Sequence, residues 1–364
     1  MFKRYRNQEF DMTFWWKKHP KEPTEYAKYI TEQLHNLLVS DSIETKKFVN
    51  QEIKKYLIIM KSIMLHEVEP KISDEIETKF YNEIINCDLF LKLIRHLPDL
   101  EFETRKDIIF LYSLSLRYFN ETNSSQTQHF FINPVMISTM LRSTELVIVG
   151  NSSRDIFLTL TNMIIESSKY ERMCELLLND EFIWRIFEYC NLPDFEISTE
   201  ALHIITTVFS IHSEVVSEFF LKGNKTSTCH ELTGVNNNAT RFIRNVNNLL
   251  VNGSYVCKRQ ITKLLGSLLI LRANNKLMMV YINNPENLRL IMTLLGNKSK
   301  SLQFEAFNIF KIIVANPEKP LTILQILANN REKLLAHLPK IGMENKDSTF
   351  SDEIDYIMQE INSF

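Results

Sequence analysis

The stretch from Tyr255 to Pro320 decides the fold, and it reads YVCKRQITKLLGSLLILRANNKLMMVYINNPENLRLIMTLLGNKSKSLQFEAFNIFKIIVANPEKP. Between residues 256 and 271, apolar side chains recur on one side of a 3.6-residue helix: Ile261, Leu264, Leu268 and Leu271. Pro285 suits the first turn of a further helix that ends at Gly296, and a third helix from Ser301 ends before Asn316-Pro317. Short amphipathic helices that end at proline or glycine, one after another, predict a stack of helices.

A second stripe on the first of these helices carries a ring and two cations. Tyr255, Arg259 and Lys263 recur every four residues on the side roughly opposite the apolar one. This spacing fits an ordinary solvated helix face. It also fits a binding surface, because arginine beside an aromatic ring is a composition enriched at protein interfaces. Periodicity alone leaves both interpretations open.

Length and composition favour a repeat array. The chain has 364 residues, 45% of them apolar, and a single compact core of that size tends to split or to become a series of repeats. Only seven glycines are present and alternating segments are rare, which disfavours sheets. The net charge of −2 argues against nucleic-acid binding, because there is no excess of cations to replace phosphate counterions. Five scattered cysteines indicate reduced thiols in the cytosol. No apolar run approaches the roughly 18 residues that a transmembrane helix needs, so we expect a soluble, cytoplasmic protein.

An internal period supports the repeat array. Six segments begin with an asparagine, at intervals of 46 or 47 residues and one of 59: Asn86, Asn133, Asn179, Asn238, Asn284 and Asn330. Apolar side chains follow four and eight residues later: Phe90 and Ile94, Ile137 and Leu141, Ile183 and Phe187, Phe242 and Val246, Leu288 and Met292, Leu334 and Leu338. We therefore predict a capping asparagine and an inward stripe in each unit. Phe102, Phe195 and Phe304, each followed by glutamate, open a longer helix in three of the units.

These patterns predict an all-α fold, an armadillo/HEAT-like right-handed superhelical solenoid of about six to seven helical repeats. We expect a disordered N-terminal extension over residues 1–11 and the repeat domain over 12–341. A polar surface loop over 222–238 accounts for the longer interval. Residues 342–364 form a linker and a last helix near 351–361 that packs on the end repeat.

The sequence shows no sign of an enzyme or of a cofactor. Metal-binding spacings such as HExxH are missing, as are glycine-rich phosphate loops and a GxSxG nucleophile turn. No Asp-rich loop supports a calcium site. We therefore predict no catalytic residues, no metal and no cofactor, and a helical solenoid without such groups is usually a binding surface.

The chain resembles a known family over nearly its whole length. YVCKRQITKLLGSLL, PENLRLIMTLL and NKSKSLQFEAFNIFKIIVANPEK are similar to the most characteristic stretch of the Mo-twenty-five-like family, also called calcium-binding-protein-thirty-nine-like. FWWKKHPKEPTEYAKYI near the N-terminus resembles its fungal, Hym-type branch. The resemblance implies a non-enzymatic, armadillo-like scaffold that binds and activates Ste-twenty or germinal-centre kinases or pseudokinases. In the fungal branch it implies action upstream of an NDR-type kinase (the RAM network), in polarised growth and cell separation.

The resemblance also implies roles for particular residues. Tyr255, Arg259, Lys263 and Phe195 match the kinase-facing residues of the concave side. Met292 and Arg272 match a C-terminal pocket that receives the partner's hydrophobic tail, although Asn275 stands where animal members have an aromatic residue. The 222–238 insertion is short in animal relatives.

Two further classes of function remain open. The groove of a solenoid also suits a peptide-binding adaptor for transport or membrane tethering that activates no kinase. An enzyme would require a dry cleft of perturbed ionisable groups, which the sequence does not reveal.

Overall fold

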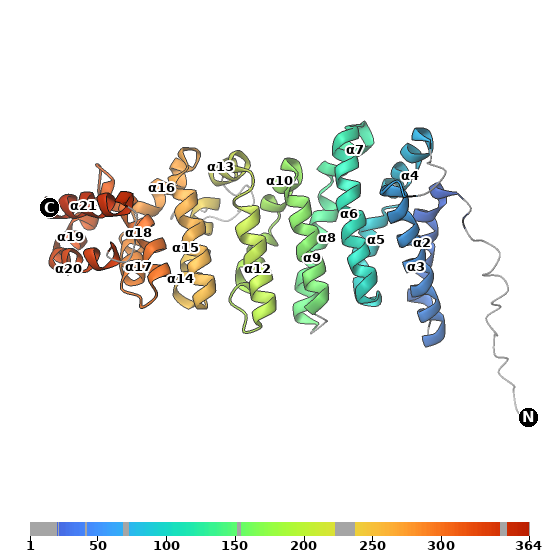
Figure 1. Cartoon of the computed structure of the whole chain (residues 1–364), viewed down its shortest axis with the longest axis horizontal. Coiled ribbons are helices and arrows are strands. Elements are labelled where there is room, and N and C mark those ends of the chain that lie inside the picture. Colours follow the sequence, from blue (N-terminus) through green and yellow to red (C-terminus); the bar gives the residue numbers. More distant parts are fainter. Residues whose placement is uncertain are drawn as a thin grey trace, which may run out of the picture. The chain divides into compact units, whose positions relative to one another are not determined.

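In a computed structural model of the chain, the described residues are 20, 22–40, 42–67, 73–150, 154–222, 237–342 and 348–363. Over these ranges the protein consists of helices and their connections, with no β-strand, which confirms the all-α prediction (Figure 1). The contacts divide the chain into two compact units. The first comprises the chain up to Ser143 together with Asn151–Thr159, and the second comprises Thr144–Gly150 and Leu160–Phe364.

The first unit is built on α2 (Tyr26–Val39), α3 (Ile43–Met64) and α6 (Phe102–Thr122), where α3 packs against both of the others. Its remaining helices are η1 (Pro23–Glu25), α4 (Asp74–Asn86), α5 (Leu89–Arg95), η2 (Leu97–Asp99), α7 (Ser125–Ile132) and parts of α8 (Pro134–Val149) and α9 (Arg154–Ser168). Arg105 of α6 is buried, and one guanidinium nitrogen donates hydrogen bonds of 3.1 Å to the carbonyls of Leu97 and Leu100. A buried arginine thus fixes the turn that leads into α6.

The second unit continues the pattern through α10 (Glu171–Asn179), α11 (Ile183–Tyr189), α12 (Phe195–Val208), α13 (Ser213–Leu221), α14 (Asn238–Asn252), α15 (Tyr255–Ile270), η3 (Arg272–Asn274), α16 (Asn275–Ile282), α17 (Pro285–Leu295), α18 (Lys300–Ala315), α19 (Leu321–Asn329), α20 (Arg331–Gly342) and α21 (Ser348–Asn362). Successive long helices pack side by side: α12 on α15, α15 on α18 and α18 on α21 (Figure 1). Shorter helices link and cover them, so the predicted repetition of helical units is confirmed.

The predicted inward stripe is confirmed at nearly every position. Eleven of its side chains are buried to 6% exposure or less: Phe90, Ile94, Ile137, Leu141, Ile183, Phe187, Phe242, Val246, Leu288, Leu334 and Leu338. Met292 is half-buried. In the α15 helix, Ile261, Leu264 and Leu268 are buried, but Leu271 is 40% exposed. Leu271 follows the last helical residue, where the backbone becomes extended, so it leaves the apolar stripe.

The prediction that each of the six asparagines caps a helix is only partly correct. The side chain of Asn284 accepts a hydrogen bond from the backbone of Glu286, and that of Asn133 accepts one from Val135, so these two cap α17 and α8. Asn86 and Asn179 are instead the last residues of α4 and α10. Asn238 lies inside α14, which its neighbour caps, and the Asn330 side chain donates back to α19. The asparagines mark helix boundaries, but most do not cap the following helix.

Other boundaries agree with the sequence, with one exception. The α17 helix ends at Gly296, α18 ends before Asn316-Pro317, and α21 packs on α20 and α18 as the last helix. Phe102 and Phe195 open α6 and α12, whereas Phe304 lies one turn inside α18. The predicted disordered extension over 1–11, most of the 222–238 loop and most of the 342–347 linker lie outside the described residues.

Four cysteines of the described chain are free thiols, and Cys174, Cys190 and Cys257 are buried. Burial raises the pKa of Cys174 to about 12 and that of Cys257 to about 11, so neither forms a thiolate near neutral pH. Across the same residues, no single helix has both the length and the apolar character to cross a bilayer. Only α12 and α13 together, bent by 91°, satisfy length and composition.

Candidate functional site

The predicted Tyr255–Arg259–Lys263 stripe lies on the exposed side of α15. The helix begins after Ser254, whose hydroxyl accepts a hydrogen bond from the backbone of Cys257, and it buries its other side in the core. All three stripe residues are exposed, and Tyr255 is 50% exposed. Their exposure agrees with their position opposite the apolar side of the helix, and we call these three residues the α15 stripe.

The neighbouring helix α18 holds one end of the α15 stripe in place. The hydroxyl of Ser299, the residue before α18, donates a 2.9 Å hydrogen bond to the phenolic oxygen of Tyr255. Further along, a side chain built on Gly266 would come 3.5 Å from Ile309 of α18. The pair Tyr255–Ser299 lies at the start of both helices, and the pair Gly266–Ile309 lies ten or eleven residues further along both. The helices α15 and α18 therefore run parallel. Residues that follow Ser299 along α18 therefore lie beside Arg259 and Lys263.

The two cations of the α15 stripe are not neutralised by an ion pair. Within the part of the chain that the structure describes, neither Arg259 nor Lys263 makes an ion pair or a side-chain hydrogen bond, unlike Lys61, whose ammonium lies 3.1 Å from Asp107. The carboxylate that interacts with them is that of Glu305 on α18. Burial raises the pKa of Glu305, while Lys263 and then Arg259 act to lower it, and the net direction is upward. The carboxylate is near both cations but is not bonded to either.

Phe195 lies at the start of α12, the helix that packs on the other flank of α15. The Asp194 side chain caps this helix by accepting hydrogen bonds of 3.1 and 3.2 Å from the backbone of Glu196 and Ile197. Phe195 is 69% exposed, more than any other phenylalanine in the described part of the chain. Phe195 and the α15 stripe thus occupy adjacent helices of the second unit.

The predicted tail-binding residues are farther along the chain. Met292 is half-buried on α17, where its neighbours Ile291 and Leu295 belong to the core. Arg272 is exposed at the start of the short helix η3, and Asn275 begins α16. Neither Met292 nor Arg272 lines the apolar pocket described next. Their joint role in a tail pocket stays a prediction.

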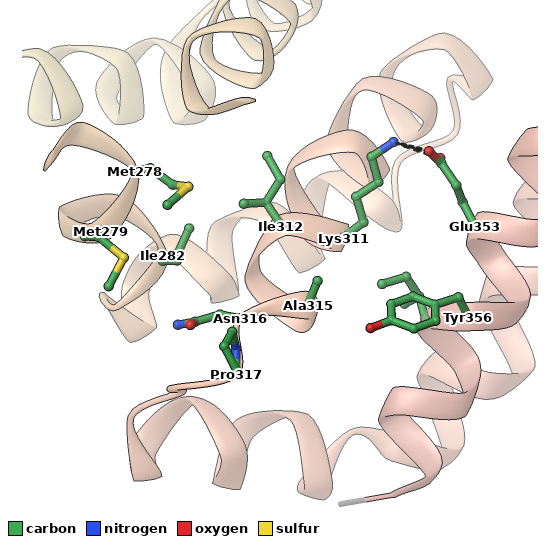
Figure 2. A pocket seen from close by; sticks show the side chains of 11 residues that line it. Met278, Met279, Ile282, Lys311, Ile312, Ala315, Asn316, Pro317, Glu353 and Tyr356 are labelled. Carbon is green, nitrogen blue, oxygen red and sulfur yellow. Dashed lines mark hydrogen bonds and ion pairs between the residues drawn. The ribbon is translucent and has the colours of Figure 1, made fainter. Parts of the chain in front are cut away.

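An apolar pocket of about 500 Å³ lies among α16, α18 and α21. Figure 2 shows Met278, Met279 and Ile282 on one side, Ile312 and Ala315 on α18, and Tyr356 opposite. The Lys311 ammonium lies 2.7 and 2.8 Å from the two carboxylate oxygens of Glu353, which ties α18 to α21 at the edge of the pocket. The sequence analysis missed this pocket, because its lining comes from three separate helices. The only local signal is the Met278-Met279 pair, because methionine is common at adaptable binding surfaces.

These surfaces combine charged, aromatic and apolar side chains. Among the described residues, no group of three or more histidine, cysteine, aspartate or glutamate side chains is placed to hold a metal ion. The α15 stripe instead offers a ring, a guanidinium and an ammonium in a row, with a half-buried carboxylate beside them. Such a row suits contact with an acidic group on the surface of a partner.

Comparison with known proteins identifies the class. The family model described as Mo25-like matches residues 14–364, so the chain belongs to the Mo25-like family, as its sequence predicted. It is 44% identical to "Protein HYM1" of Saccharomyces cerevisiae, over the whole of this chain and 88% of that protein. It is 28% identical to the "Mo25-like protein" of Schizosaccharomyces pombe, over 96% of this chain and 99% of that protein. It is 29% identical to the human protein "Calcium-binding protein 39-like", over 94% of each chain.

Proposed function

We propose that this protein is a non-catalytic scaffold that binds and conformationally activates a Ste-twenty/germinal-centre-type protein kinase. In this proposal it works in RAM/NDR kinase signalling, in the cytoplasm and at sites of polarised growth. Membership of the Mo25-like family and the similarity to HYM1 support it. The main structural support is the α15 stripe. Its two cations are exposed and make no ion pair within the described chain, and they lie in a row with the half-exposed Tyr255.

The mechanism is a shift of population between kinase conformations. A scaffold that prefers the closed, active conformation stabilises it by the difference between its affinities for the two states, about 1.4 kcal/mol for each tenfold preference. Arg259 and Lys263 meet acidic groups of the kinase, while Tyr255 and Phe195 supply apolar contact that excludes water. Met292 and Arg272 receive the hydrophobic C-terminal tail of the kinase or pseudokinase.

The test is charge reversal at the centre of the α15 stripe. The protein is first used to recover the kinase from source cells, and the purified kinase domain is then assayed with each variant. Arg259→Glu should abolish activation, because truncating a hot-spot arginine costs about 2 kcal/mol or more and charge reversal adds repulsion to that loss. Circular dichroism and the melting temperature should stay near those of the wild type, because Arg259 is exposed and unpaired within the described chain.

Arg244 provides a matched control. It is also exposed, has no ion pair in the described part of the chain, and lies on α14, next to α15. Arg244→Glu changes the net charge equally and should leave activation intact. Equal activation by the two variants would exclude the α15 stripe as the kinase contact.

A second function is favoured by the apolar pocket of Figure 2, whose volume lies in the usual range for ligand pockets. A peptide-binding adaptor for transport or membrane tethering would place an apolar side chain there and would activate no kinase. Recovery of extended peptides, without a folded kinase domain, would favour this alternative over kinase activation.

A further inference from the structure

Glu305 has an unusual position among the acidic residues near the α15 stripe. It lies on α18, half-buried, and interacts electrostatically with Lys263 and Arg259 across the contact between α15 and α18. The parallel course of the two helices, which follows from the Ser299–Tyr255 hydrogen bond and the approach of Gly266 to Ile309, places it alongside the cations. Figure 1 shows the two helices as neighbours in the second unit.

The Phe-Glu pairs that open α6 and α12 provide a comparison. Glu103 forms a 3.0 Å ion pair with Lys106 on its own helix, which is an ordinary surface pair. Glu196 is exposed in the first turn of α12. Of these three glutamates only Glu305 is half-buried, and it faces cations of another helix. The same dipeptide therefore occupies a different electrostatic setting in each repeat.

A pair of exposed cations without a nearby anion attracts polyanions of any kind, since such binding depends mainly on charge. A carboxylate held beside the pair reduces the local charge from about +2 to about +1, and it does so without occupying either cation. A partner whose acidic group makes direct contact with Arg259 or Lys263 still gains the short-range interaction. A flexible polyanion that approaches only loosely loses most of its attraction.

We propose that Glu305 is a specificity-determining residue of this surface, which prevents Arg259 and Lys263 from binding anionic polymers at large. The surface is thereby restricted to partners that present a fixed acidic group at contact distance. The inference takes from the proposed function only that the α15 stripe is the binding surface.

The test uses the full-length protein and fluorescein-labelled heparin, followed by fluorescence anisotropy at several salt concentrations. Glu305→Gln should bind heparin about three- to fivefold more tightly than the wild type at low salt, as expected for one unit charge at close range near a surface. Its affinity should also fall more steeply with salt, because about one more cation becomes available to displace counterions. Any heparin binding by other basic segments is common to all variants and does not affect the comparison.

Three variants separate charge from structure. Glu196→Gln makes the same charge change on α12 and should alter heparin affinity much less. Glu305→Asp keeps the charge and should bind heparin as the wild type does. In the triple variant with Arg259→Gln and Lys263→Gln, the gain from Glu305→Gln should disappear.

The inference is overturned if Glu305→Gln binds heparin no more tightly than Glu196→Gln, or if neither binds at all. It is also overturned if Glu305→Asp gains as much affinity as Glu305→Gln, or if the triple variant keeps the gain. The kinase assay is independent of these outcomes. A heparin gain without kinase binding refutes the proposed function alone, and kinase activation without a heparin gain refutes this inference alone.

Discussion

Replacing Phe187 by alanine should be among the more costly single changes in the second unit. The ring of Phe187 is 2% exposed, and its centroid lies 5.8 Å from each of the rings of Trp184, Phe209 and Phe242. These rings come from α11, α14 and the end of α12, so the truncation opens a cavity where three helices meet. Phenylalanine-to-alanine changes in cores cost about 3–5 kcal/mol. Each aromatic pair adds about 0.5–1.5 kcal/mol beyond the buried area. We therefore expect Phe187→Ala to lower the free energy of unfolding by about 4–5 kcal/mol, near the upper end of this range.

Trp184 makes a local assay possible. It is buried and stacks on Phe187, and the other two tryptophans of the chain are Trp15 and Trp16. In a background with Trp15→Phe and Trp16→Phe, tryptophan fluorescence during urea unfolding reports only the surroundings of Phe187. This matters because repeat arrays can unfold in parts, so a global signal would average over repeats that do not contact this cluster.

The matched control is Phe187→Leu, which keeps most of the volume and should cost about 1–1.5 kcal/mol. A loss below about 1 kcal/mol for Phe187→Ala, or equal losses for the two variants, would refute the reasoning. Either result would mean that Phe187 is not packed in the inward stripe, and the 46-residue register on which the repeat assignment rests would be wrong.

Three further changes test the packing elsewhere, each by urea unfolding. Gly266→Ala should stabilise the protein by up to about 1 kcal/mol, because the new methyl group lies at an ordinary 3.5 Å from α18 and alanine favours the helix; a loss would contradict this. Gly253→Ala should destabilise it by about 1–3 kcal/mol, because the methyl group would lie 2.5 Å from the Leu249 carbonyl oxygen, and an unchanged midpoint would show that this connection yields. Arg105→Met should cost about 1–3 kcal/mol by removing the donor to two carbonyls of the turn before α6, and a neutral result would mean that this turn holds without it.

The register of the helices was predictable from sequence, whereas the capping residues were predictable only in part. Burial every three to four residues is a local pattern, which is why Phe90, Ile137 and Leu288 could be assigned to the core from spacing alone. Asparagine is favoured both before a helix and just after one. A recurrent asparagine therefore locates the boundary between two helices without saying which helix it serves, as Asn86 and Asn179 demonstrate.

The candidate site was predictable along one helix and unpredictable across helices. The exposure of Arg259 and Lys263 follows from their position opposite the buried side of α15. Ser299 bonds to Tyr255, and Glu305 interacts with Lys263 and Arg259, only because α15 and α18 run parallel. Ser299 and Glu305 lie some 40 positions after the α15 stripe in the chain, so sequence spacing does not reveal these interactions. The same reason hides the pocket of Figure 2, whose lining combines three helices that are far apart in sequence.

The charge balance of the whole chain and that of the α15 stripe lead to different expectations about binding. A net charge of −2 provides no general attraction for an acidic partner. At physiological salt the field of an exposed charge is screened within about 8 Å, so the α15 stripe attracts an acidic group only from nearby. Its two cations therefore act over little more than contact distance, and the half-buried Glu305 weakens even that field. If the α15 stripe is the binding surface proposed above, a partner is recognised there by fit: an acidic group placed against Arg259 and Lys263, and an apolar surface placed against Tyr255 and Phe195. A folded domain can offer both at fixed positions, which a flexible acidic chain cannot do without a large cost in conformational entropy.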